Sequence, residues 1–510
     1  MKFLGLSFLA GLVAALGFEP VGLWPLTVLG FAALMGLIFT APSMRSTLAR
    51  GWWFGVGHFT LGLNWIATAF TYQSAMPAWL GWIAVVLLSL YLAVFPAAAA
   101  GLAWRWGRAD GLRFILLFAA AWIVTEWLRA TLFTGFAWNP AGVALLDSRL
   151  DQLAPWIGTY GVSGVAMLFS GALMLVAMER RRPRTMILAG GVVAAMVAAP
   201  FANRAAAGAA GAPIRIVQPN IGQQDKWREG FEEQNFERLR RLSGVPGETP
   251  RLLLWPEAAI TDALQDERSD PFYQQQAARE RQRAASVLGP RDLLLTGGVT
   301  FQSVDGRKVT SATNSVFAIG AAGRILARYD KAHLVPYGEY LPARPLLSRL
   351  GLSRLAPGSV DFDAGPGPGT LVLPLVGDVG FQVCYEIIFS GQVVDPHHRP
   401  DFIFNPSNDA WFGAWGPPQH LAQARMRALE EGLPVLRSTP TGISAVIDSD
   451  GNVLHSLPWR TAGAIDARLP PPEPATLFAR LGNMLPFLLA LLLVAAALAG
   501  DRIAARRKQR

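Results

Sequence analysis

The chain has 510 residues, a formal net charge of +9 and a composition that is 52% hydrophobic but only 16% charged. Soluble globular chains carry about 25% charged residues, so part of this chain is expected in a membrane. Much of its arginine lies beside apolar segments, where membrane topology accounts for it, and we therefore expect no nucleic-acid partner. The single cysteine excludes an intrachain disulfide and a multi-cysteine metal site.

The first predicted elements are apolar runs of about 20 residues, the length that crosses a bilayer. These runs are 3–18, 22–40, 52–71, 80–103, 114–134, 158–178, 185–201 and 477–499. They predict eight membrane-spanning helices, of which seven lie in residues 1–203 and the eighth at 477–499. The first run has features of a signal peptide. We favour a retained span because a second apolar run follows almost at once.

The basic residues predict the orientation of these spans. Lysine and arginine gather before the first span and after the second, fourth, sixth and eighth, whereas the alternate connections, such as 71–78, are nearly free of them. Basic loops stay in the cytoplasm, so both termini are predicted to be cytoplasmic. The long stretch 202–476 is then predicted outside the cytoplasm, on the periplasmic face if the cell is Gram-negative.

That long stretch has the pattern of a layered α/β domain. Short apolar runs alternate in it with helix-like segments, which is typical of sheets covered on both faces. Strands are predicted at 214–221, 251–258, 292–301, 314–320, 324–331, 379–386, 401–409 and 442–451, and helices at 271–288 and 415–431.

Three of these strand ends carry ionisable residues, namely Glu257, Lys331 and Cys384. Each alone has an ordinary explanation, as a helix cap, a solvated lysine or a small buried thiol. Strand ends converge in α/β folds, however, and together the three residues form a set for acyl transfer. The thiol would attack, the glutamate would take its proton, and the lysine would stabilise the oxyanion. His333 is a weaker candidate base.

The segments around these residues resemble a known superfamily. "WPE" with Glu257, "YDKAHLVPYGE" with Lys331 and "CYE" with Cys384 resemble the Glu-Lys-Cys triad of the nitrilase superfamily. With the predicted spans and the segments 218–227, 408–413 and 419–448, essentially the whole chain resembles the bacterial apolipoprotein N-acyltransferase family.

The resemblance implies an α+β membrane protein. Its parts would be a seven-span transmembrane bundle at 1–203, an extracytoplasmic nitrilase-like αββα sandwich at 213–470, and an eighth span at 477–499 with a basic cytoplasmic tail to residue 510. It implies a multi-pass protein of the inner membrane, for which we expect a monomer.

The resemblance also implies a reaction, in which a fatty acyl chain passes from a membrane phospholipid to an apolipoprotein. The donor would be similar to phosphatidylethanolamine. The acceptor would be the α-amine of an N-terminal diacylglyceryl-cysteine. Cys384 would carry the chain as a thioester and Glu257 would act as general base. Lys331 and a backbone N–H near Tyr385 would hold the oxyanion. No cofactor or metal is implied.

Further residues match the family by position. Glu339 would orient Lys331 or Cys384. Tyr385 and Glu386 would fix the strand end of the nucleophile or contact head groups, and Trp227 and Trp411 would contact lipid chains or form a lid. Each also has a structural explanation: a solvated turn for Glu339, local support for Tyr385 and Glu386, and loop packing for the tryptophans.

Three polar residues inside the predicted spans, His58, Glu126 and Arg129, are functional candidates by their position. They could instead pair with one another, or Arg129 could meet a phosphate.

Other functions fit parts of the pattern. A membrane-tethered amidase acting on a small amide would use the same triad, but one span would suffice to anchor it. An inactive lipid-binding scaffold fits less well, because the triad is intact. A transporter would leave the domain at 213–470 unexplained.

Overall fold

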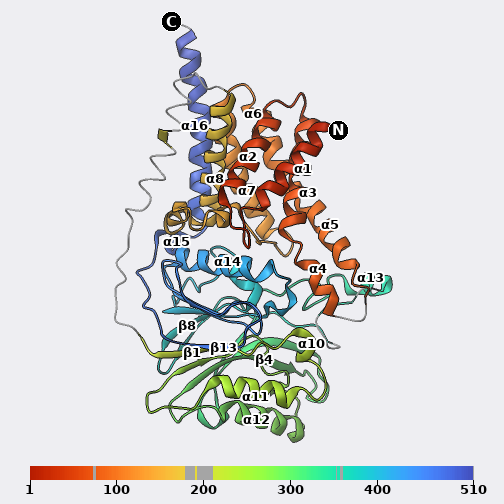
Figure 1. The fold of residues 1–510 in the computed structure, drawn as a ribbon, viewed down its shortest axis with the longest axis vertical. Helices are drawn as coiled ribbons and strands as arrows, with labels where there is room; N and C mark the ends of the chain where they lie inside the picture. The colour runs from red at the N-terminus through yellow and green to blue at the C-terminus, as the bar shows by residue number, and fades with distance from the viewer. Residues whose placement is uncertain (73–75, 179–189, 192–210, 352, 356–359, 509–510) are drawn as a thin grey trace. The chain divides into compact units, whose positions relative to one another are not determined.

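The computed structural model describes residues 1–72, 76–178, 190–191, 211–351, 353–355 and 360–508 (Figure 1). The chain divides into two compact units. The first comprises residues 1–67, 81–204 and 475–510, and the second comprises 68–80 and 205–474.

The first unit is helical. Its helices pack closely where small residues meet; a Cβ added to Gly11 or Gly57 would lie 2.0 to 2.2 Å from a backbone oxygen of the opposing helix. The main elements are α1 (Lys2–Ala15), α2 (Trp24–Phe39), α3 (Met44–Gly62), α5 (Leu80–Leu92), α6 (Val94–Gly107), α7 (Gly111–Thr131), α8 (Ala154–Met178), α15 (Leu477–Leu481) and α16 (Met484–Lys508).

Three helical segments in the described residues are long and apolar enough to cross a membrane. They are Leu80–Gly107, Gly111–Thr131 and Leu150–Met178; shorter apolar helices occupy Lys2–Ala15, Trp24–Phe39 and Met484–Ala499. The predicted span 52–71 differs from the structure, because α3 begins at Met44 and ends at Gly62. The side chain of Ser43 caps this helix by accepting from the N–H of Ser46. The predicted span 185–201 lies outside the described residues except for 190–191.

The second unit contains two β-sheets. The first has the order β13-β1-β2-β4-β5-β6, with β3 also paired to β4, and the second has the order β12-β11-β10-β9-β8-β7. In chain order the strands are β1 (Pro213–Gln218), β2 (Leu252–Leu254), β3 (Ala263–Asp266), β4 (Leu293–Gln302), β5 (Ser311–Ile319), β6 (Ile325–Asp330), β7 (Thr370–Leu373), β8 (Gly377–Phe381), β9 (Phe402–Pro406), β10 (Val435–Ser438), β11 (Ala445–Ile447), β12 (Val453–Ser456) and β13 (Gly463–Arg468).

The sheets pack face to face, with helices on the outside. Along β2, alternate side chains point to opposite faces, so Leu252 and Leu254 join a core with Phe404 and Leu436 of the second sheet. Leu253 instead packs beneath α11 (Glu232–Ser243) and α12 (Pro271–Ala285). Helix α14 (Gly416–Glu431) packs on β10 of the second sheet. The layers are therefore helix, sheet, sheet and helix (Figure 1).

The strand pattern differs from the prediction in two respects. The predicted strand 379–386 ends at Phe381, and Cys384–Ile388 form a 3-10 turn, η7, so the cysteine lies on a turn rather than a strand. Strands β3, β7, β10, β12 and β13 were not predicted. Strand β10 contains the polar residues Arg437 and Ser438. A short sequence with a charged residue does not have the apolar pattern by which a buried strand is predicted.

Candidate active site

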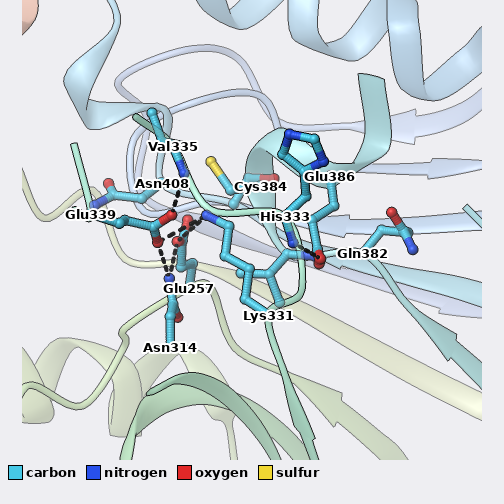
Figure 2. Close-up of polar contacts among 12 residues, drawn as sticks. Glu257, Asn314, Lys331, His333, Val335, Glu339, Gln382, Cys384, Glu386 and Asn408 are labelled. Carbon is cyan, nitrogen blue, oxygen red and sulfur yellow. Dashed lines mark hydrogen bonds and ion pairs between the residues drawn. The ribbon is translucent and has the colours of Figure 1, made fainter. Parts of the chain in front are cut away.

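The structure brings Glu257, Lys331 and Cys384 together, from turns that follow three different strands (Figure 2). Glu257 follows β2, Lys331 follows β6 directly, and Cys384 follows β8 of the other sheet. All three are buried, and Lys331 is only 1% exposed. Since β8 belongs to a different sheet from β2 and β6, the packing of the two sheets assembles this site.

The ammonium of Lys331 lies among buried carboxylates. Its Nζ is 3.0 Å from Oε1 of Glu339 and 3.7 Å from Oε1 of Glu257. The amide nitrogen of Asn314 donates to the same two oxygens, at 2.7 Å for Glu257 and 2.8 Å for Glu339. Burial acts to lower the pKa of Lys331, but Glu339 and then Glu257 outweigh it and raise that pKa. Lys331 is therefore a permanent cation, and Glu339 is its nearest partner rather than a solvated turn residue.

Glu257 presents one occupied and one open oxygen. Oε1 receives the hydrogen bond from Asn314, whereas Oε2 is buried and has no hydrogen-bond partner among the described residues. The backbone of Glu257 is also held, because Nζ of Lys226 donates to its carbonyl at 3.0 Å. This arrangement keeps the carboxylate in place while leaving an oxygen that can take a proton.

Cys384 is held in an unusual conformation. It has φ of +53°, in the left-handed region that costs a residue with a side chain free energy, and it begins the η7 turn. Burial and then the charge of Glu257 raise the pKa of its thiol well above the ordinary value, whereas Lys331 and a hydrogen bond from the backbone of Asn408 lower it. The thiol is therefore protonated at rest, and it needs a base to become a nucleophile.

Glu386 anchors the turn of the nucleophile to the segment that follows Lys331. Its Oε1 accepts from the backbone N–H groups of Ala332 and His333 at 2.8 and 3.0 Å, and its Oε2 accepts from the N–H of Val383 at 2.7 Å. Burial raises the pKa of Glu386 to about 7, although these N–H donors and Lys331 act to lower it. The geometry favours local support for Glu386 rather than contact with head groups.

The neighbouring aromatic rings support the same turn. The ring of Tyr385 packs against Phe389 with centroids 5.2 Å apart, and the ring of His333 stacks on Phe389 at 3.9 Å. His333, which the sequence marked as a weaker candidate base, thus has a packing role and a backbone bond to Glu386.

The two predicted lipid-contacting tryptophans differ in exposure. Trp227 is 43% exposed, directly after the short helix α10 (Gln223–Lys226). Trp411 is partly buried, and its ring centroid lies 6.1 Å from that of Tyr72. A cavity of about 450 Å³ is lined in part by Tyr72, Gln223 and Phe412. Gln223 accepts a hydrogen bond from the side chain of Asn408, and the backbone of Asn408 hydrogen-bonds Cys384. Asn408 therefore connects the wall of this cavity to the nucleophile.

Sequence reasoning missed several residues of the site. Asn314 lies between Thr313 and Ser315 in the polar first half of β5, and nothing in that run distinguishes it from its neighbours. Lys226 is buried beside Glu257, and burial lowers its pKa to about 8 although Glu257 and Cys384 act to raise it. The sequence gives no signal for Lys226, because a lysine in a polar segment is usually exposed.

The polar residues of the helical unit pair with one another and with backbone. Oε1 of Glu126 accepts from the N–H of Ala141 at 2.8 Å and lies 4.0 Å from Arg129, which donates to the carbonyl of Trp138 at 2.8 Å. The ring of His58 stacks on Phe54. Arg129 is 3% exposed, which favours an internal role over contact with a phosphate.

Family models match both units of the chain. Residues 214–474 match the family model of the carbon-nitrogen hydrolases, so the second unit is a domain of that family. Residues 10–173 match the model of the apolipoprotein N-acyltransferase N-terminal domain.

Curated relatives extend the match to nearly the whole chain. An apolipoprotein N-acyltransferase of Rhodopseudomonas palustris is 36% identical, over 94% of this chain and 91% of the relative. That of Bradyrhizobium diazoefficiens is 35% identical, over 93% and 90%. The chain belongs to the apolipoprotein N-acyltransferase family. It is an acyltransferase of lipoprotein biosynthesis, and with its apolar helices it is a bacterial membrane protein.

Proposed function

We propose that the chain transfers a fatty acyl group from a membrane phospholipid to the α-amine of an N-terminal diacylglyceryl-cysteine, by way of a thioester on Cys384. The observation that carries the proposal is the convergence of Glu257, Lys331 and Cys384, with Oε2 of Glu257 open and Lys331 held as a cation. A phospholipid similar to phosphatidylethanolamine is the proposed donor.

In the first half-reaction, Glu257 takes the proton of the thiol and the sulfur of Cys384 attacks the ester carbonyl. Negative charge develops on the carbonyl oxygen, where Lys331 and the backbone N–H of Tyr385 would stabilise it. The ester C–O bond then breaks. Glu257 returns the proton to the alkoxide, and lysophospholipid leaves with the acyl group retained on sulfur.

In the second half-reaction, the lipoprotein amine attacks the thioester carbonyl and Glu257 takes a proton from the nitrogen. The C–S bond breaks as the amide forms, and the proton returns to the sulfur of Cys384. Water must be kept from the thioester, since hydrolysis would turn the transferase into a phospholipase. Trp227 and Trp411 are proposed to contact the lipid chains and contribute to this exclusion.

We also propose the membrane arrangement that the sequence predicts, with eight spans, both termini cytoplasmic, and residues 213–470 as a periplasmic catalytic domain of a monomer. The alternation of basic loops supports it. An impermeant maleimide tests it on Val245→Cys in a Cys384→Ala background, since Val245 is 88% exposed. Labelling in intact spheroplasts is expected for this variant and not for Lys508→Cys. The reverse result would contradict the orientation.

Intact-mass spectrometry tests the chemistry. The purified protein is incubated with phosphatidylethanolamine, with and without a peptide bearing an N-terminal diacylglyceryl-cysteine. We expect an acyl-sized mass gain on Cys384 that disappears when the peptide is added, with one acyl group recovered as an amide on the peptide.

Two controls separate this proposal from its rivals. Cys384→Ala should gain no mass yet remain folded, because the two side chains are similar in size. An unmodified wild-type protein that hydrolyses small amides would favour the membrane-tethered amidase, and a protein inert in both assays would favour the lipid-binding scaffold.

A further inference from the structure

A second polar cluster lies behind the nucleophile and is absent from the mechanism above. It consists of Asp409, His420 and Arg437, each fully buried. Asp409 begins the short turn η8 (Asp409–Trp411), His420 lies on α14, and Arg437 lies on β10. Burying charged groups is costly unless they are paired, so the cluster must be held together internally.

The charges of the cluster are paired around the histidine ring. Nη2 of Arg437 donates to both oxygens of Asp409, at 2.8 and 2.7 Å, and it lies 2.9 Å from Nδ1 of His420. Oδ1 of Asp409 also lies 2.9 Å from Nδ1. Nδ1 can therefore form a hydrogen bond with either Asp409 or Arg437, and either bond holds the ring in the same orientation.

The other ring nitrogen reaches the nucleophile. Nε2 of His420 lies 3.0 Å from the carbonyl oxygen of Cys384. A carbonyl can only accept, so Nε2 carries the hydrogen, and this holds for a neutral or a charged ring. Burial and Arg437 lower the pKa of His420, so the ring is neutral near pH 7 and Nδ1 accepts from Arg437.

The same helix holds the far end of the nucleophile turn. Nη1 of Arg427 lies 3.3 Å from the carbonyl of Ile388, the last residue of η7, whereas His420 holds Cys384, the first. Residues seven apart lie on one face of a helix. Helix α14 therefore holds both ends of the turn by their carbonyls.

We propose that His420 is a positioning residue for acyl transfer, which holds the carbonyl of Cys384 and so aims the N–H of Tyr385 at the oxyanion. This inference rests on the proposed function of the site. In a planar trans peptide, the C=O of one residue and the N–H of the next point in opposite directions. A hydrogen bond that fixes the carbonyl of Cys384 therefore also fixes the direction of the N–H of Tyr385.

The conformation of Cys384 explains why such a clamp is needed. Its φ of +53° is unfavourable for a residue with a side chain, so the turn would relax without external support. An oxyanion donor is effective only when it is already oriented as charge develops, and removing one typically costs about 10²–10³-fold in rate. His420, oriented by Asp409 and Arg437, would supply that orientation.

The test compares two reactions of the same thiol. Acylation by phosphatidylethanolamine passes through an oxyanion, whereas alkylation by iodoacetamide displaces iodide and forms none. We expect His420→Leu to slow single-turnover acylation of Cys384 by at least about ten-fold, with alkylation unchanged. His420→Gln should recover much of the acylation, because its amide N–H can donate to the same carbonyl.

A matched control separates positioning from stability. Met426 is fully buried on the same helix, and Met426→Ala should lower the melting temperature without a selective loss of acylation. Equal losses of acylation and alkylation in His420→Leu, or acylation at the wild-type rate, would overturn the inference. If His420→Leu does not fold, Asp409→Asn must slow acylation while alkylation does not fall, because the charge of Asp409 raises the pKa of the Cys384 thiol and its removal cannot make the thiol less reactive. A wild-type protein that forms no adduct would overturn the proposed function itself.

Discussion

The backbone N–H of Ala332 donates to the carboxylate of Glu386 at 2.8 Å, and this bond joins the residue next to Lys331 to the turn that begins at Cys384. Ala332 follows β6 of the first sheet and Glu386 follows β8 of the second, so no local interaction sets their separation. Glu386 thereby links the segment of Lys331 to the turn of Cys384 and helps to fix the distance between the ammonium and the thiol.

We predict that Glu386→Gln lowers both stability and acylation. The amide nitrogen of Gln cannot accept a hydrogen bond, so it leaves buried backbone donors unsatisfied at a cost of about 1–3 kcal/mol. The melting temperature in detergent and the rate of thioester formation should both fall. Glu237→Gln, on an exposed side chain of α11, is the control and should change neither. A wild-type rate in Glu386→Gln would argue against the anchoring role.

Glu257→Gln is expected to make the thiol more acidic and the enzyme inactive. Burial and the charge of Glu257 raise the pKa of Cys384, so removing that charge lowers the pKa. At a pH below the wild-type thiol pKa, more thiolate is present and alkylation by iodoacetamide is faster. Acyl transfer should nevertheless fall by about 10²–10⁴-fold, because the general base is lost.

The pH dependence of alkylation measures this effect. Its midpoint should lie at lower pH in Glu257→Gln than in the wild type. A midpoint displaced upward, or transfer retained at the wild-type rate, would contradict the role of Glu257.

Gly297 is predicted to be essential for the position of Glu257. A Cβ at this position on β4 would lie 2.4 Å from the nitrogen of Ala258 and 2.6 Å from Cα of Glu257. Gly297→Ala must therefore displace the backbone that carries the base, at about 1–3 kcal/mol, and acylation should fall with it. Gly247→Ala, which meets nothing within 4 Å, is the control for thermal unfolding and activity. An active, stable Gly297→Ala would show that the segment can move freely.

Trp227 should matter for lipid substrates and not for folding. Its side chain is 43% exposed, so Trp227→Ala is expected to leave the melting temperature and alkylation of Cys384 nearly unchanged while slowing acylation by phospholipid. Phe272→Ala, which also removes an exposed ring, provides the comparison and should leave acylation unchanged. Equal rates for the two variants would assign Trp227 to ordinary loop packing.

Prediction of the elements from the sequence worked best where the pattern is local. Strands β1, β4 and β9 and helices α12 and α14 fall where apolar periodicity placed them. Strand β10 was not predicted because it contains Arg437, and a buried arginine is stable in a strand only when a partner neutralises its charge. That partner is Asp409, which comes from another segment of the chain. The strand predicted through Cys384 was wrong for a similar reason. Cys384 instead lies on a turn with a left-handed conformation, which hydrogen bonds with Glu386 and His420 stabilise.

The sequence by itself determined the apolar helices, the layered α/β domain and the identity of Glu257, Lys331 and Cys384, because hydrophobic period and reactive residue types are written along the chain. Only the tertiary structure decided which other residues bind and orient these three. Asn314 bridges two carboxylates and His420 holds the carbonyl of Cys384, and each pairing joins segments far apart in sequence. The physical reason is that a hydrogen bond depends on distance and direction, which arise only when the two sheets and their helices pack.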